Sequence, residues 1–181
     1  RRQLDVCPML EQELRLRLLN FQNNNIRKIQ HLENLPNLIF LDMYNNKLAT
    51  LDGPISSVRG LRVLMAGKNR ITTISNLSTL RKLDVLDLHS NDIKQIEGLQ
   101  GLSDLRVLNL AGNSIALVNN LTSLQSLTEL NLRRNVIEKV EELDKLPALQ
   151  RVFLSHNLIK NLADVQCLFL VKFLIELSLD G

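Results

Sequence analysis

Tryptophan is absent from this chain of 181 residues, and only six residues are aromatic. The two cysteines, Cys7 and Cys167, provide neither a disulfide framework nor the close ligand spacing of a metal site. So few cysteines favour a reducing, cytoplasmic compartment. Apolar runs such as Cys167 to Val171 are much shorter than the roughly 20 residues that cross a bilayer, so no membrane partner is expected.

A strong charge of one sign is lacking as well. The formal net charge is +3; the first 90 residues carry 13 Lys and Arg against 8 Asp and Glu, and the remaining 91 carry 9 against 11. This mild asymmetry is not the basic footprint of a dedicated nucleic-acid binder, so no nucleic-acid partner is expected. The seven glycines are scattered and form no phosphate-binding loop, so no cofactor is expected.

Residue combinations that suit catalysis are also scarce. Only three histidines occur, and two of them adjoin a serine, in the pairs His89–Ser90 and Ser155–His156. Adjacent residues of a strand point in opposite directions, so neither pair suits a base that activates a nucleophile. We therefore predict that the protein is not an enzyme.

Leucine dominates what the chain does contain, with 41 residues, and its spacing is periodic. The pattern L-x-x-L-x-L-x-x-N-x-I recurs, most clearly from Leu83 to Ile93 and from Leu105 to Ile115. Its copies begin at residues 16, 38, 61, 83, 105, 127, 149 and 174. A fixed period of this length is the signature of a repeat architecture.

Each repeat has a simple physical interpretation. The L-x-L alternation predicts a short strand with one buried face, and apolar residues three apart, such as Ile93, Ile96 and Leu99, suit tight 3-10 turns. One repeat cannot bury its own apolar face, but stacked repeats share a continuous core. We predict an α/β leucine-rich-repeat solenoid: a right-handed horseshoe arc with a parallel concave sheet of about eight strands and a convex side of short 3-10 turns.

Asparagine occupies the same place in seven successive repeats: Asn24, Asn46, Asn69, Asn91, Asn113, Asn135 and Asn157. Its side chain both donates and accepts hydrogen bonds, and a polar group beside the core is costly unless it is satisfied. We therefore predict a ladder in which each Asn bonds backbone groups of its own coil and of the next coil.

The pattern resembles that of leucine-rich-repeat proteins with 22-residue repeats, such as the nuclear regulatory subunit of type-one protein phosphatase, over residues 16 to 179. Further strings resemble the leucine-rich-repeat subunit of the tubulin polyglutamylase complex and related proteins of centrioles, basal bodies and cilia. They are Arg17 to Gln22, Gly67 to Ile71, Leu83 to His89, Leu127 to Arg133, Phe153 to Ser155 and Asp180–Gly181. This resemblance implies a scaffold near microtubules.

Two parts are expected: an N-terminal cap over residues 1–15 and a repeat array over residues 16–181. Gly53 and Pro54 mark a one-residue insertion in the second repeat, and the apolar stretch Ala163 to Ile175 predicts a longer, more helical last convex segment. Since the chain opens on Arg1 and stops at Gly181, before the eighth Asn, we expect a truncated C-terminal cap and a longer native protein.

The variable positions between the repeat leucines predict the binding face, because strand side chains alternate between the two faces of a sheet. Five consecutive repeats place an apolar residue at the first of these positions: Leu18, Phe40, Val63, Val85 and Val107. With about 4.8 Å between strands they would form an exposed apolar stripe roughly 20 Å long, and such stripes usually mark interaction surfaces. Beside this apolar stripe we expect Asp42, Tyr44, Met65, Asp87 and His89.

A second candidate surface lies toward the C-terminal end and comprises Arg133, Arg134, Arg151, Phe153 and His156. We call it the basic patch. It could receive an acidic segment such as a glutamate-rich tail, and an ordinary solvated face is the alternative. Its aromatic side chain is of the kind that anchors protein interfaces.

These observations predict a non-enzymatic scaffold that binds another protein on its concave face, at a basal body, centriole, cilium or other cytoskeletal structure. A tubulin-modifying complex is the suggested partner. The alternative is a regulatory subunit that binds the catalytic subunit of type-one protein phosphatase. An extracellular recognition module is a third possibility, which the lack of cysteine-rich caps disfavours.

Overall fold

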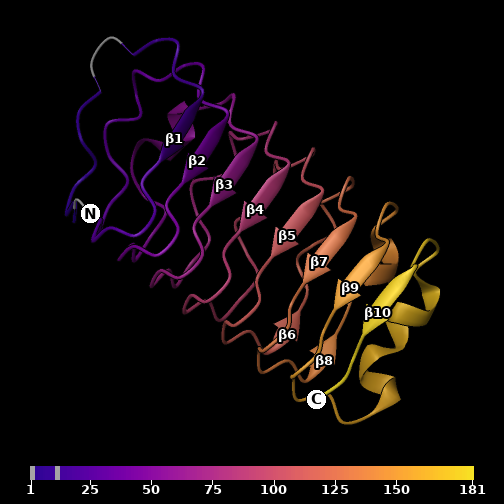
Figure 1. Cartoon of the computed structure of the whole chain (residues 1–181). Helices are drawn as coiled ribbons and strands as arrows, with labels where there is room; N and C mark the ends of the chain where they lie inside the picture. The colour runs from indigo at the N-terminus through magenta and orange to yellow at the C-terminus, as the bar shows by residue number, and fades with distance from the viewer. Residues whose placement is uncertain (1–2, 11–12) are drawn as a thin grey trace.

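Eight short parallel strands lie side by side along the molecule, one for each repeat (Figure 1). The computed structural model describes residues 3–10 and 13–181, so residues 1, 2, 11 and 12 of the predicted cap lie outside the described residues. The strands are β1 (Leu18–Asn20), β2 (Phe40–Asp42), β3 (Val63–Met65), β4 (Val85–Asp87), β5 (Val107–Asn109), β7 (Glu129–Asn131), β9 (Arg151–Phe153) and β10 (Glu176–Ser178). Their order in the sheet follows the sequence, which confirms the predicted solenoid and its eight-stranded sheet.

The side opposite the sheet is made of tight turns and short 3-10 helices. The helices are η1 (Pro54–Ser57), η2 (Leu143–Lys145) and η3 (Leu162–Leu170). The helix η1 follows Gly53, where the second repeat has its extra residue, and η3 forms the longer last segment that the sequence predicted. A small second sheet was not predicted: β6 (Leu117–Val118) pairs with β8 (Lys139–Val140).

The repeat leucines form one continuous core. Leu86, Leu108 and Leu130, at the centres of three successive strands, are all fully buried. Burying each such side chain contributes about 1.5–3 kcal/mol, which is what stabilises strands of only three residues. No helix among the described residues is long and apolar enough to cross a membrane.

The asparagine ladder is present. Asn91 Nδ2 donates to the carbonyl oxygens of Leu88 in its own coil (2.9 Å) and Ala66 in the preceding coil (3.0 Å). Its Oδ1 accepts from the backbone N–H of Ile71, also in the preceding coil, at 2.9 Å. The same three bonds recur at Asn46, Asn69, Asn113, Asn135 and Asn157. The prediction was wrong in one respect: each Asn satisfies the preceding coil rather than the next, because the next coil brings its own Asn to do so.

Residues 3–10 follow the backbone pattern of a coil. The N–H of Leu4 donates to Asn24 Oδ1 (2.9 Å), and the N–H of Asn25 donates to the Leu4 carbonyl (2.8 Å). Ile26 makes the equivalent bonds with the following coil. Cys7 packs into the core, where burial raises the pKa of its thiol. The boundary between cap and array stays a prediction.

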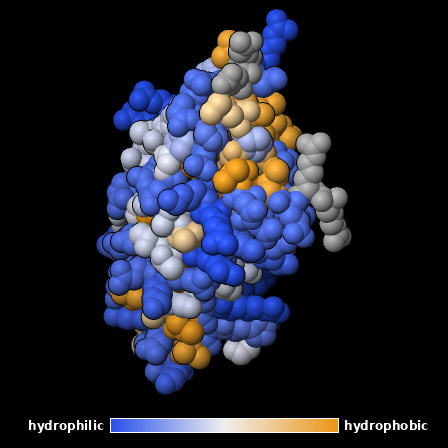
Figure 2. Space-filling view, turned by 90° about the vertical axis from the view of Figure 1, so that its left-hand side faces the viewer, coloured by the Kyte–Doolittle hydropathy of each residue, from blue (hydrophilic) through white to orange (hydrophobic). Residues whose placement is uncertain are grey.

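Apolar surface is concentrated at the two ends of the solenoid. Figure 2 shows a mostly hydrophilic face with apolar atoms gathered in its upper part and a smaller apolar group near its lower edge. Near the N-terminus, Val6, Met9 and Leu14 are each more than half exposed. At the other end, Leu162, Phe169, Leu170, Phe173 and Ile175 are exposed. In the middle of the array, by contrast, the exposed large apolar side chains are only Leu117 and Val136, at 37% and 40%.

Candidate protein-binding face

The apolar stripe exists as an unbroken row. Leu18 lies opposite Phe40, Phe40 opposite Val63, Val63 opposite Val85, and Val85 opposite Val107. Leu18 is 57% exposed, whereas the other four side chains are half-buried because each packs against its neighbours in the row. The row ends at Glu129, which lies opposite Val107. The strands therefore present a shallow apolar surface with a charged boundary.

A second row of side chains lies two residues after the stripe residue of each strand, on the same face of the sheet. This row has a structural role that sequence reasoning missed. In five repeats an Asn or Asp oxygen accepts the backbone N–H two residues later, which is an Asx turn. The five acceptors are Asn20, Asp42, Asp87, Asn109 and Asn131, with distances of 2.8–3.2 Å. Asp42 and Asp87 are each only 9% exposed, because their carboxylates close these turns.

Tyr44 and His89 meet on this face although they come from coils that are not adjacent. Their ring centroids lie 5.7 Å apart, and Lys68 Nζ lies 5.4 Å from the Tyr44 ring centroid. Gly67 belongs to the coil between them, and a Cβ atom there would collide with the His89 imidazole. His89 is held from below by Asp87, whose Oδ1 lies 2.7 Å from Nδ1. The glycine thus permits an aromatic pair that borders Met65 and the apolar stripe.

The basic patch is less cationic than its sequence indicates. Arg151 Nε donates to Glu129 Oε2 at 2.9 Å, so the charge of Arg151 is matched. The Arg133 guanidinium lies over the Phe153 ring, 4.1 Å from its centroid. Phe153 is therefore only 8% exposed, so its ring offers little surface to a partner in this arrangement.

A depression of about 450 Å³ adjoins this patch; its lining includes His89, Arg133, Arg134, His156 and Asp180. Ser155 donates a hydrogen bond to Asp180 (2.5 Å). This bond holds the pKa of the Asp180 carboxyl below its usual range, and the nearby charges of His156 and Arg133 lower it further. An acid is thus already present among the cations of the depression.

The Ser–His pairs singled out in the sequence are engaged elsewhere. His89 Nδ1 contacts Asp87, and the Ser155 hydroxyl contacts Ser178 and Asp180. Among residues 3–10 and 13–181, no group of three or more His, Cys, Asp or Glu side chains could hold a metal ion. The geometry of this face suits the binding of another molecule's side chains.

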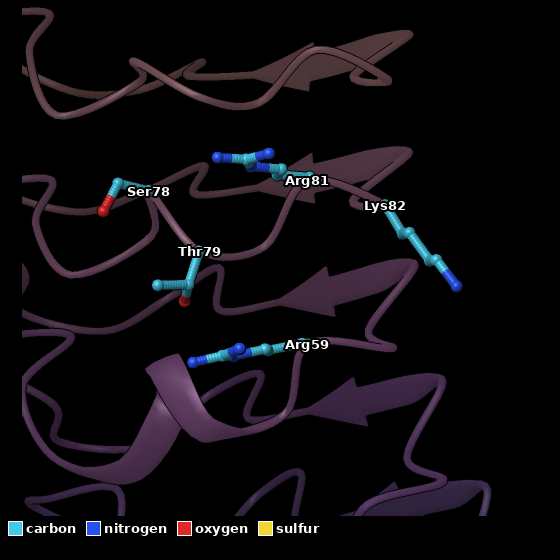
Figure 3. A pocket seen from close by; sticks show the side chains of 5 residues that line it. All are labelled: Arg59, Ser78, Thr79, Arg81 and Lys82. Atoms are coloured by element: carbon cyan, nitrogen blue, oxygen red, sulfur yellow. The ribbon is translucent and has the colours of Figure 1, made fainter.

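One further feature was not found from the sequence. A hollow of about 710 Å³ on the flank of the solenoid is lined by Arg59, Ser78, Thr79, Arg81 and Lys82 (Figure 3). Its sequence signal is weak: two arginines stand at the same place in adjacent repeats, which becomes visible only when the repeats are aligned.

The comparisons agree with the fold. Models of leucine-rich repeats match residues 14–56, 59–115 and 125–167, so the chain belongs to the leucine-rich-repeat family. An internalin of Listeria monocytogenes superposes with a TM-score of 0.76 at 25% sequence identity, and the match covers 93% of this chain and 56% of the internalin chain. A leucine-rich-repeat protein of Leptospira interrogans superposes with a TM-score of 0.62 at 26% sequence identity, and the match covers 93% of this chain and 55% of that protein's chain.

Sequence relatives are similar over a shorter range. Leucine-rich repeat-containing protein 49 of Homo sapiens is 51% identical over 59 residues, which is 33% of this chain and 8% of that protein. The protein of the same name from Mus musculus is 55% identical over 40 residues, which is 22% of this chain and 6% of that protein. The aligned segment is thus less than a tenth of the length of these relatives. Solenoids of this family present extended surfaces that bind other proteins.

Proposed function

We propose that this chain is the docking part of a non-enzymatic scaffold and that it binds another protein on its concave face at a microtubule-based structure, as part of a tubulin-modifying complex. The observation that carries the docking role is the in-register apolar stripe from Leu18 to Val107. The strings that resemble a tubulin polyglutamylase subunit and proteins of basal bodies, centrioles and cilia support the location.

The chemistry of the face indicates how a partner would bind. The apolar stripe offers area that is removed from water on contact, and the Tyr44–His89 pair offers a rigid anchor beside it. Arg133 and Arg134 add donors at the C-terminal end of the face. A partner segment that is apolar along its centre and acidic at one end complements this arrangement.

Substitution of one stripe residue tests the docking role. Val85→Glu places a charge in the middle of the apolar stripe, where Val85 is half-buried, and we expect it to abolish capture of the partner by the tagged protein in cells. Val136→Glu is the matched control, because Val136 is 40% exposed and lies outside the sheet. Far-ultraviolet circular dichroism would show whether both variants keep the fold.

Proximity labelling with the same protein identifies the partner. Labelling of tubulin or its modifying enzymes that Val85→Glu removes would support the proposal. Equal capture by wild type and Val85→Glu would overturn the docking role. Labelling of a type-one phosphatase catalytic subunit that depends on Val85 would replace the microtubule role with the phosphatase alternative. A diffuse cytosolic signal from the tagged protein would contradict the proposed location.

A further inference from the structure

The hollow on the flank concentrates positive charge in two neighbouring coils. Arg59 comes from the coil that leads into β3, and Ser78, Thr79, Arg81 and Lys82 come from the coil that leads into β4. Figure 3 shows both guanidinium groups extending in the same direction on either side of Thr79, whereas the Lys82 side chain extends the opposite way. Two fork-shaped donors therefore open onto one space.

The hollow is held in place by contacts between the coils. The Thr79 hydroxyl donates to the Ser56 carbonyl oxygen at 2.9 Å, which ties the second coil to the end of η1. The helix η1 follows Gly53, where the second repeat has its extra residue, and Arg59 lies two residues after the helix ends, with its N–H donating to the Ser57 carbonyl at 3.0 Å. The insertion thus shapes the segment that carries the first arginine.

Within the part of the chain that the structure describes, Arg59, Arg81 and Lys82 form no salt bridge. The five ion pairs found there involve His89, Arg106, Lys139, Lys145 and Arg151. Arg59, Arg81 and Lys82 are all exposed and belong to none of them. Lys82 and nearby Arg62 also line a neighbouring depression with Asp84 and Asp104. The positive charge of the hollow is therefore centred on Arg59 and Arg81.

The repeat itself does not require arginine at this place. The equivalent position, two residues before the first Leu of the repeat, holds Lys172 in the last coil and a residue without a positive charge in five others: Leu14, Pro36, Ser103, Gln125 and Pro147. Those five coils stack in the same way without a cation. The two guanidinium groups are therefore additions to the scaffold rather than part of its packing.

We propose that this hollow binds a phosphorylated serine or threonine side chain of a protein partner. Arginine forks donate paired hydrogen bonds to the oxygens of an oxyanion, and a phosphate with a charge near −2 matches two guanidinium groups better than a single carboxylate does. The Ser78 hydroxyl supplies a further donor. No aromatic side chain lines the hollow to stack on a base, and no large apolar one lines it to enter a bilayer.

This site goes beyond the proposed function, because it lies on the flank and not on the concave face. Through this site the same scaffold would make a second contact with a partner, and that contact would form only when the partner is phosphorylated. The two roles are separable: Val85→Glu disables the concave face and leaves the hollow intact, and Arg59→Gln does the reverse.

The probe is a short peptide in which one phosphoserine is flanked by glycine and alanine, titrated into the 181-residue chain. Nuclear magnetic resonance follows the Nε–Hε signals of Arg59 and Arg81, which we expect to shift together and saturate. Arg59→Gln and Arg81→Gln should each weaken binding by about tenfold, as expected for loss of charge-assisted hydrogen bonds. Arg27→Gln is the matched control, since Arg27 is an exposed arginine in another coil, and it should leave binding unchanged.

Control titrations separate this proposal from its competitors. The unphosphorylated peptide should not bind, and a peptide with Glu in place of phosphoserine should bind clearly more weakly. Equal binding of the Glu peptide would overturn the preference for phosphate. Absence of saturable shifts at millimolar phosphopeptide would overturn the site, as would tighter, Arg59-dependent binding of single-stranded RNA or of phosphatidylserine vesicles.

Discussion

At the scale of the residue, one asparagine per repeat decides whether neighbouring coils can stack. The Asn91 side chain is only 7% exposed and bonds three backbone groups from two coils. A second asparagine or aspartate in most repeats closes the turn after the strand. Most buried polar residues among those described therefore bond the backbone, and Ser155, whose hydroxyl bonds the side chains of Ser178 and Asp180, is an exception.

Asn91→Ala tests the ladder. The substitution removes three hydrogen bonds: it leaves the buried Ile71 N–H without its acceptor and takes one donor each from the Leu88 and Ala66 carbonyls, which keep Asn113 and Asn69. We expect a loss of roughly 2–4 kcal/mol in the free energy of unfolding, measured by urea denaturation. Asn119→Ala, at a half-buried asparagine outside the ladder, should cost much less. Equal losses in the two variants would contradict the role of the ladder.

The ion pair between Asp84 and Arg106 predicts a pH dependence. Arg106 donates from Nε and Nη2 to the two carboxylate oxygens, at 2.5 Å each, and these bonds lower the pKa of Asp84 below its ordinary value. The stabilisation is thus complete above the unfolded-state pKa, about 3.9, and is lost as pH falls through the lower folded-state value.

Asp84→Asn removes the charged pair and checks this prediction. Its destabilisation relative to wild type should be small, constant near neutral pH, and should shrink below about pH 4. Denaturant midpoints over a pH series measure it. Asp92→Asn controls for the loss of one negative charge at an exposed site. A difference that grows on acidification would contradict the assignment.

At the scale of the element, strands of three residues and tight turns are stable only because they are packed. In the main sheet, every strand from β1 to β9 buries its central side chain and leaves its two flanking side chains on the concave face, whereas β10 only half-buries its central side chain. The connections differ more than the strands do, since η1, η2, η3 and the β6–β8 pair each occupy particular coils. Variation in the turns is therefore tolerated as long as the strand register is kept.

Gly98→Ala tests how tight these turns are. Gly98 has a φ of +67°, and a Cβ atom there would collide with the Ile74 carbonyl of the preceding coil. We expect a loss of at least about 1–3 kcal/mol in the free energy of unfolding. Gly60→Ala is the control, because its Cβ would lie 3.5 Å from the Leu38 carbonyl oxygen without a positive φ. That variant should be neutral or stabilised by up to about 1 kcal/mol; similar losses in both would refute the collision.

At the scale of the whole molecule, stability depends on contacts between neighbouring coils, as in other solenoids. The central coils are packed on both sides, whereas the last strand, β10, pairs only with β9. Its central residue Leu177 is half-buried, unlike the fully buried Leu108 of β5. The array should therefore be most tightly held in the middle and loosest at its ends.

Leu108→Ala and Leu177→Ala test this gradient. The first leaves a cavity in the middle of the core and should cost about 2–5 kcal/mol. The second should cost under about 2 kcal/mol and speed amide exchange only near β10. Hydrogen exchange of the two variants distinguishes local from global effects, and equal, global effects would contradict a nearest-neighbour solenoid.

The sequence by itself determined the solenoid, the eight strands, the asparagine ladder and the apolar stripe, because each depends on a spacing that repeats every 22 residues or so. Leu18, Phe40 and Val63 align as soon as the repeats are aligned. Strand alternation then fixes which side of the sheet they occupy.

Only the tertiary structure decided features that depend on the shapes of single side chains in neighbouring coils. It buried Asp42, Asp87 and Phe153, brought Tyr44 to His89 over Gly67, and opened the hollow between Arg59 and Arg81. Periodicity predicts which positions share a face, since that follows from backbone geometry. It does not predict which of those side chains will bond the backbone, cover one another or remain free, because that depends on packing in three dimensions.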